Sequence, residues 1–208
     1  MRTGARIVAA VEVLDAVFGN HRPAADALAD WGRGHRFAGS GDRSAIGHLV
    51  YDALRRRQSL AARMGGDASR ALAIAAAPEA LGIPAEDVIT AADGSEHSIA
   101  PLSAGEKAGL ARAVPADTPD WVAGDVPEWL APSFRRVFGD RVAEEGAALA
   151  RRAPVEVRVN TLKATREKVL KALAHFGAEP TRLSPLGVLM PPPLGARRHP
   201  QVEAEAAH

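Results

Sequence analysis

The hydrophobic pattern of this 208-residue chain changes its period near residue 155. Upstream, apolar residues recur every three to four positions, as in residues 5–18, and this spacing is typical of amphipathic helices. At Val155, Val157 and Val159 the spacing becomes two, with polar residues between, which indicates a half-buried strand. The pattern therefore predicts a mainly α chain, in which an all-α helical bundle precedes a small α+β domain.

The bundle is expected to be built around one central helix. Asp42 is expected as its N-cap, and a stripe of apolar residues from Ala45 to Leu54 gives it a buried face. Further helices are expected at residues 5–18, 23–32, 60–64, 68–77 and 103–113, the last opened by the capping box Ser103-Ala-Gly-Glu106. The stretch 116–127 is rich in Asp and Pro and is interpreted as a linker. The predicted domains are residues 1–118 and 119–208.

The second domain is expected to pack helices on a sheet. Short helices are expected up to Gly139 and over residues 140–152, followed by a strand that begins at Val155. Thr165 is the expected cap of a helix that ends at Gly177. Two further strands are predicted at residues 179–184 and 187–190.

The net charge of +1 conceals an uneven distribution along the chain. It is +4 over residues 1–63, −5 over residues 64–118 and +5 over residues 130–182. Arg55, Arg56 and Arg57 close the central helix, where the helix dipole favours cations, and at least one must point away from the core. These features favour a polyanion-binding surface. The alternative is a solvated helix end in a chain that is rich in arginine.

Residues for catalysis or cofactor binding are not recognisable. The chain has no cysteine, which removes disulfides, thiolate metal sites and thiol nucleophiles. Its histidines lack metal-ligand spacing, and the glycines at Gly39 and Gly41 precede a helix without a preceding strand. Neither a signal peptide nor a membrane span is recognisable, so a cytoplasmic location is expected. We expect no catalytic residue, no cofactor and no metal in this chain.

Three motifs resemble the RsmB/Sun family of RNA (cytosine-5) methyltransferases. The first is Asp42-Arg43, Leu49-Val50-Tyr51 and Leu54-Arg55, which resembles the DR…LVYG…LR signature of the family's NusB-like domain, although Asp52 stands at the usual glycine. The second is PEWLAPSFRRVFG at 127–139, and the third is RVNTLK at 158–163. Both are similar to motifs that precede the family's catalytic domain.

The resemblance implies an RNA-binding N-terminal region, which holds rRNA for a catalytic domain that uses S-adenosylmethionine and a cysteine nucleophile. That domain would follow this chain, and the end of the sequence, Gln201–His208, favours a truncation or a frameshifted gene. The expected RNA-binding residues are Arg43, Arg55, Arg56, Arg57, Arg158, Asn160 and Lys163.

Alternatives to this interpretation stay open. Arg158 could pair with Glu156 on the same strand face, and Asn160 could be a turn residue that hydrogen-bonds its own backbone. The whole chain could be a free-standing NusB-like factor that acts in transcription antitermination or ribosome assembly. It could also be a protein-interaction module whose helical bundle binds a protein partner.

Overall fold

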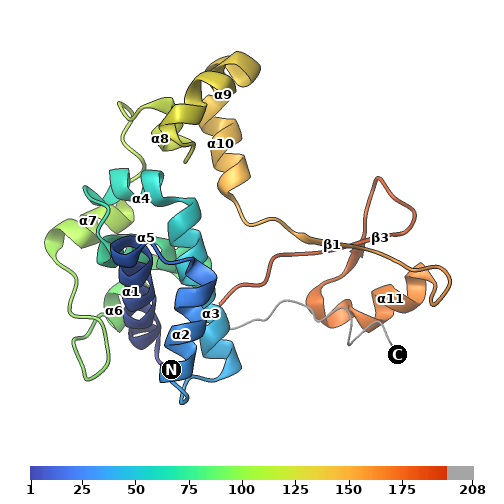
Figure 1. Ribbon diagram of the computed structural model, residues 1–208, viewed down its shortest axis with the longest axis horizontal. Coiled ribbons are helices and arrows are strands. Elements are labelled where there is room, and N and C mark those ends of the chain that lie inside the picture. The colour runs from blue at the N-terminus through green and yellow to red at the C-terminus, as the bar shows by residue number, and fades with distance from the viewer. Residues whose placement is uncertain (196–208) are drawn as a thin grey trace. The chain divides into compact units, whose positions relative to one another are not determined.

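The computed structural model describes residues 1–195, which form two compact units. Unit 1 comprises residues 1–151 together with Leu194 and Gly195, and unit 2 comprises residues 152–193. Unit 1 is helical, and unit 2 combines a helix with a three-stranded sheet. The predicted fold class, mainly α with a small α+β part, is confirmed (Figure 1). The closing run Gln201–His208 lies outside the described residues.

Three helices supply most of the core of unit 1. They are α1 (Thr3–Asn20), α3 (Ser40–Arg55) and α5 (Ser69–Leu81), which contact one another pairwise (Figure 1). The remaining helices of the bundle are α2 (Ala24–Gly34), α4 (Arg57–Met64), α6 (Ala85–Ala91) and α7 (Ala104–Ala111). The largest buried side chains of the core are Ile7, Leu14, Ile46, Leu49, Leu60, Leu72 and Ile74. Burial of this apolar surface is the main force that holds the helices together.

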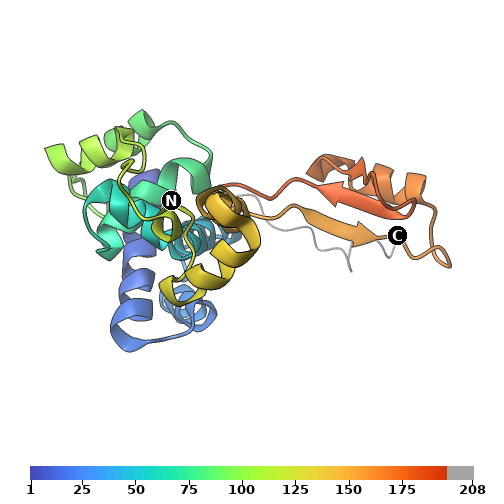
Figure 2. The ribbon, with the colours of Figure 1, turned by 90° about the horizontal axis from the view of Figure 1, so that it is seen from above.

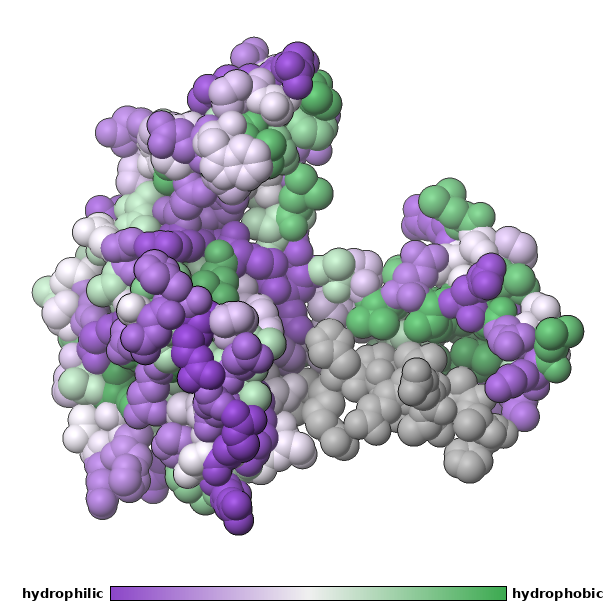
Figure 3. Space-filling view, in the orientation of Figure 1, coloured by the Kyte–Doolittle hydropathy of each residue, from purple (hydrophilic) through white to green (hydrophobic). Residues whose placement is uncertain are grey.

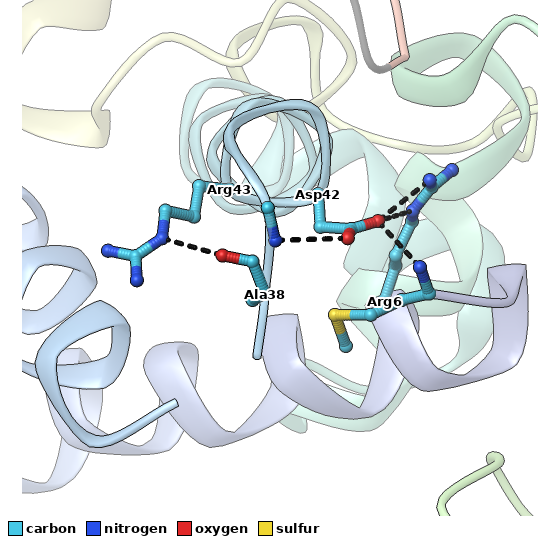
Figure 4. A network of polar contacts seen from close by, with 6 residues as sticks. Arg6, Ala38, Asp42 and Arg43 are labelled. Atoms are coloured by element: carbon cyan, nitrogen blue, oxygen red, sulfur yellow. Dashed lines mark hydrogen bonds and ion pairs between the residues drawn. The ribbon is translucent and has the colours of Figure 1, made fainter. Parts of the chain in front are cut away.

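The start of α3 differs from the expectation. The helix begins at Ser40 with Gly39 as its N-cap, so the prediction of Asp42 as the N-cap is wrong. Asp42 instead lies in the first turn, where its Oδ2 accepts a hydrogen bond from the Gly39 N–H at 3.3 Å. Its Oδ1 accepts from Arg6 Nη2 at 2.8 Å, which links α3 to α1 (Figure 4). A carboxylate in the first turn faces the positive end of the helix dipole and is favourable there.

The environment of Asp42 also sets its acidity. Burial alone would raise the pKa of this carboxyl group, but hydrogen bonds from the N-terminal amine and Arg6 stabilise the charged form. The pKa of Asp42 therefore lies below its ordinary value.

The predicted capping box at the start of α7 is confirmed. The Ser103 N–H donates to Glu106 Oε2 at 2.8 Å, and the Glu106 N–H donates to Ser103 Oγ at 3.2 Å. Helix α6, which the sequence did not predict, begins directly after Pro84, whose fixed φ suits the residue before a helix.

The stretch predicted as a linker is packed against the bundle, so that prediction is wrong. It contains a short helix, α8 (Asp120–Ala123), which contacts α4 and α10. The Asp125 carboxylate accepts hydrogen bonds from the Ser59 N–H at 2.9 Å and the Ser59 hydroxyl at 2.6 Å. Burial raises the pKa of Asp125, and the Ser59 bonds partly offset that rise.

Unit 1 continues past α8 to residue 151. It includes the 3-10 segments Glu128–Leu130 and Gly139–Arg141 and the helices α9 (Ala131–Phe138) and α10 (Val142–Ala150). Backbones approach closely here, since a Cβ on Gly146 would lie 2.4 Å from the Gly124 carbonyl oxygen. Residues 119–151 therefore belong to the same compact unit as the bundle. The division into domains expected at 118/119 stays a prediction.

Unit 2 is a helix packed on an antiparallel sheet. The strands β1 (Val155–Arg158), β2 (Glu179–Pro180) and β3 (Gly187–Met190) are ordered β1-β3-β2, and Figure 2 shows β1 and β3 running in opposite directions. Helix α11 (Arg166–Ala172) and a 3-10 turn, Ala174–Phe176, connect β1 to β2. The buried core consists of Val159, Val169, Leu173, Val188 and Met190.

Most expectations for unit 2 are met. The valines of β1 face inward while Glu156 and Arg158 are exposed, and the helical segment ends at Gly177 with φ +75°. The strand predicted at 179–184 is wrong beyond Pro180. Thr181 instead begins a loop, in which its hydroxyl donates to the Ser184 carbonyl at 3.1 Å. Proline has no N–H for a strand ladder, so Pro180 suits the end of a short edge strand.

Candidate nucleic-acid interface

The two units differ in net charge. Residues 1–151 contain seventeen Arg and Lys against twenty Asp and Glu, and residues 152–193 contain seven against three. Unit 2 is therefore positively charged in its described part, and the rest of the chain up to residue 151 is slightly negative. Electrostatic attraction of a polyanion is expected mainly at unit 2.

Arg43, a predicted RNA-binding residue, holds a loop of the bundle. Its Nε donates to the Ala38 carbonyl oxygen at 3.0 Å (Figure 4). Its Nη2 donates to the Gly32 carbonyl oxygen at 2.7 Å. A Cβ at position 32 would lie 2.5 Å from the Arg43 guanidinium, so the glycine leaves room for this contact. Arg43 therefore fixes the connection between α2 and α3.

The other three bundle arginines lie where α3 ends and α4 begins. Arg43 and Arg55 are twelve positions apart in α3, which places them about 18 Å apart along the helix. Arg55 forms an ion pair with Asp52, and Arg56 forms one with Glu79. The structure therefore brings Arg55, Arg56 and Arg57 together but not Arg43.

Arg57 makes two contacts of its own. Its Nη2 lies 2.6 Å from Asp67 Oδ2, and its guanidinium lies over the Phe18 ring, 4.5 Å from the ring centre. A phosphate that binds at this end of α3 would compete with these carboxylates.

A cleft adjoins these arginines within unit 1. It has a volume of about 480 Å³ and is lined by Arg55, Arg57 and Trp121 together with Asp67, Asp125 and Glu128 among others. Its charged lining thus includes three carboxylates, which do not favour an anion.

In unit 2 the predicted residues gather at one end of the sheet. Arg158 is the last residue of β1 and lies opposite Gly187, the first residue of β3. One residue further, the Val159 N–H donates to the Leu186 carbonyl oxygen at 2.9 Å. The turn after β1 and the loop before β3 are therefore neighbours, although they are more than twenty residues apart in sequence.

Asn160 and Lys163 lie in the turn after β1. The Asn160 side-chain oxygen accepts a hydrogen bond from the Leu162 N–H at 3.1 Å, so Asn160 does act as a turn residue. The Lys163 N–H donates to the Asn160 carbonyl oxygen at 2.9 Å, and Lys163 is exposed.

The sequence did not single out Arg182, which lies in the loop before β3 and is exposed. Arg166 ties this loop to the start of α11, because its Nη2 donates to the Thr181 carbonyl oxygen at 3.1 Å. Only the strand register reveals that Arg182 shares its end of the sheet with Arg158. We name Arg158, Asn160, Lys163 and Arg182 the sheet-end cluster.

The cations of the sheet-end cluster have no acidic partner among residues 1–195. The alternative pair between Arg158 and Glu156 is not formed there. The loops also carry Leu162 and Leu183, which are 95% and 99% exposed. In the space-filling view, hydrophilic and hydrophobic residues alternate over the surface of unit 2 (Figure 3). Free cations beside exposed apolar side chains suit contacts with phosphates, sugars and bases.

Within the described residues, no three His, Asp or Glu side chains are grouped as metal ligands. No helix in that part of the chain has the length and apolar character needed to cross a membrane.

Residues 126–195 match the family model described as "Methyltr_RsmF/B-like, ferredoxin-like domain". The match covers all of β1, α11, β2 and β3, whose order is that of the first four elements of the β-α-β-β-α-β ferredoxin-like pattern. It begins in unit 1 and takes in α9 and α10 as well. It does not reach residues 1–125, where the NusB-like interpretation stays a prediction.

Among solved structures, the crystal structure of PH0851 is similar, with a TM-score of 0.46 and 18% sequence identity. The similarity covers 91% of this chain and 49% of that one, so the chain spans about half the length of this relative. No curated protein matches the chain. Residues 126–195, which include the sheet-end cluster, are therefore similar to the ferredoxin-like domain of RsmF/B-like methyltransferases.

Proposed function

We propose that the chain is the RNA-binding N-terminal region of an rRNA cytosine-5 methyltransferase that uses S-adenosylmethionine. The observation that carries the proposal is the sheet-end cluster, whose cations are unpaired within the described residues and lie in the segment that matches an RsmF/B-like domain. In this proposal the chain holds rRNA for a catalytic domain outside these residues.

The charge of the cluster supports binding to an RNA backbone. Arg158, Lys163 and Arg182 are exposed, so they lose little solvation before they meet a phosphate. Since none of them has an ion pair with a described residue to break, each can neutralise a phosphate directly and release a counterion. Such contacts position an RNA without reading its sequence.

The bundle arginines have a secondary place in the proposal. Arg55, Arg56 and Arg57 would bind phosphate only by exchanging the carboxylates that they now contact. Arg43 acts indirectly, because both of its described donor contacts are to the backbone of the loop between α2 and α3.

The chemistry of methyl transfer belongs to the other domain in this proposal. Attack on a cytosine ring requires a strong nucleophile such as a thiolate, and this chain has no cysteine. The residues of this chain would bind and orient the RNA. Both S-adenosylmethionine binding and the nucleophile are assigned to the catalytic domain, and the whole protein is proposed to act in the cytoplasm.

The test is RNA binding by the full chain, measured by fluorescence anisotropy with a labelled single-stranded rRNA fragment over a range of salt concentrations. The triple variant R158Q/K163Q/R182Q is expected to bind at least tenfold more weakly at 0.1 M salt. Its salt slope should fall by about 2, since each phosphate contact on a single strand contributes about 0.7. Single variants of the three positions should each lower the slope by less than 1.

The matched control is R22Q/R135Q/R141Q, which removes the same charge from three exposed arginines that are ion-paired in unit 1. Equal losses in both triple variants, or no loss in either, would contradict the proposal.

The mass of the native gene product tests whether this chain is part of a longer methyltransferase. A longer product with a cysteine-containing second half supports the methyltransferase, whereas a product of 21.8 kDa would support a free-standing RNA-binding factor.

A further inference from the structure

Three aromatic rings form a ladder at the end of α2. The Trp31 and His35 rings are stacked, with centroids 4.2 Å apart and an angle of 9° between their planes. The Phe37 ring meets His35 edge-on, with centroids 5.7 Å apart and an angle of 81°. Phe37 is 73% exposed, so the outer end of the ladder faces solvent.

The ladder borders a cleft of about 770 Å³ within unit 1. Helix α1 contributes apolar side chains to its lining, among them Ala5 and Val8, and the loop 95–98 contributes polar ones. The cleft therefore combines an apolar floor with an aromatic wall, which is the usual composition of a site for a planar organic group.

The ladder is held in place by polar contacts. The Trp31 Nε1–H donates to Glu12 Oε2 at 2.7 Å, and His35 Nδ1 lies 2.8 Å from the Trp31 carbonyl oxygen. The loop closes with a hydrogen bond of 3.0 Å from the Ala38 N–H to the His35 carbonyl oxygen. Arg43 then binds the Ala38 carbonyl oxygen, so the loop that presents Phe37 is anchored on both sides (Figure 4).

Two cations lie next to the ladder without an acidic partner in the described residues. Arg36 is exposed and lies between His35 and Phe37 in the sequence, and Arg2 is exposed and lines the cleft. The nearby carboxylates have contacts of their own: Glu12 accepts the Trp31 indole N–H, and Glu96 lies 3.6 Å from His97. Charges of both signs therefore border the cleft, and Arg2 and Arg36 are the cations that can contact a phosphate there.

We propose that the ladder is a stacking platform for an unpaired nucleobase of single-stranded RNA, with Arg2 and Arg36 on the neighbouring phosphates. Aromatic rings beside cations bind single strands in this way, because every base has a flat face. The proposal deepens the proposed function and rests on it, and it adds a contact in unit 1 that the sheet-end cluster does not supply. A base paired in a duplex cannot stack there, so the platform favours single strands.

The test uses the full chain and a single-stranded oligoribonucleotide that carries 2-aminopurine, whose fluorescence changes when it stacks. Phe37→Leu keeps an apolar side chain but removes the ring. It should lower the affinity for the single strand about tenfold. It should also abolish the fluorescence change and leave the salt slope unaltered. Phe37→Trp should retain both the affinity and the fluorescence change. Arg36→Gln should lower the salt slope by about 0.7.

The control is Trp129→Leu, which removes an aromatic ring of unit 1 that is 79% exposed and is not part of the cleft lining. Unchanged affinity and fluorescence in Phe37→Leu would overturn the proposal, and so would an equal loss in Trp129→Leu. If Phe37→Leu binds like wild type while R158Q/K163Q/R182Q loses affinity, the platform fails and the proposed function stands. If neither variant affects binding, both fail.

Discussion

Within residues 1–151, nine of seventeen Arg and Lys side chains form ion pairs with Asp or Glu, whereas none of the seven in residues 152–193 does so with a described residue. Several pairs in unit 1 join helices that are distant in sequence, such as Arg70 with Glu106 and Arg56 with Glu79. In unit 2 the cations that do bond, Arg152 and Arg166, bond to backbone carbonyl oxygens.

The difference shows that the number of basic residues in a region does not predict how many of them lack an acidic partner among the described residues. Unit 1 contains three consecutive arginines, but each has a carboxylate next to it. Unit 2 contains no such run, yet its strand register collects isolated cations at one end of the sheet. Arginine in unit 1 chiefly supports the fold, whereas Arg158 and Arg182 of unit 2 are exposed and have no acidic partner among the described residues.

The largest expected effect is the unfolding of unit 2 when a side chain of its small core is truncated. Unit 2 has five buried core residues, among them Leu173, which is 1% exposed. Leu173→Ala should cost about 2–5 kcal/mol, which is a large part of the stability of so small a unit. Unit 2 should unfold while unit 1 stays folded, and RNA affinity should drop to that of R158Q/K163Q/R182Q. Urea unfolding followed by hydrogen exchange checks this, and a joint loss of both units would show that they do not fold separately.

The second prediction separates supporting arginines from binding ones. Arg43→Met leaves two backbone carbonyl oxygens without their charged donor and, because Arg43 is partly solvated, should lower the free energy of unfolding by about 1 kcal/mol. Arg182→Met, an identical change at an exposed arginine for which the structure shows no hydrogen bond to a described residue, should alter stability by less than about 0.5 kcal/mol. Thermal unfolding of both variants measures the two losses of stability. Equal losses would contradict the distinction between fold-supporting arginines in unit 1 and binding arginines in unit 2.

The third prediction is a pH dependence in unit 1. The hydrogen bond from Arg70 lowers the pKa of Glu106 below its ordinary 4.5. The ion pair therefore adds stability above pH 4.5, and this contribution is lost as the pH falls through the lower, folded-state pKa. Glu106→Gln should cost about 1 kcal/mol at pH 7 and much less in strong acid. Urea unfolding at both pH values checks it, and a cost that does not change with pH would contradict the assignment.

The smallest expected effect comes from removing the carboxylate partners of two arginines in unit 1. Asp67→Asn with Glu79→Gln removes the partners of Arg57 and Arg56 without touching the arginines. RNA affinity should rise about two- to threefold, because two cations become available for phosphates. Asp26→Asn with Asp87→Asn makes the same change of charge at exposed carboxylates that have no ion pair with a described residue. If that control raises affinity as much, net charge rather than pairing is the cause.

Features decided by near neighbours in sequence could be predicted. The capping box at Ser103 and Glu106 and the alternation along β1 depend on residues at most four positions apart, and the structure shows both. The packing of the supposed linker could not be predicted. It depends on hydrogen bonds between Ser59 and Asp125, which are 66 positions apart, and on the close approach of Gly124 and Gly146.

The residues of the candidate site could be predicted only where they are close together in the sequence. The sequence indicated Arg158, Asn160 and Lys163 because they are close together in a strand and the turn that follows. It gave no sign of Arg182, which joins them only through the pairing of β1 with β3. It also did not reveal the partners of Arg56 and Arg57, since Glu79 and Asp67 lie on other segments.

The short strand β2 has a consequence for how unit 2 behaves at high concentration. It forms one border of the sheet, is two residues long and contains Pro180, so it offers little to a strand from another molecule. The opposite border is β1, whose outer side has no strand partner within residues 1–195. Addition of a further strand is therefore favoured along β1 over β2. We expect any self-association of unit 2 through its backbone to use β1, and pairing of two β1 edges would join molecules in pairs.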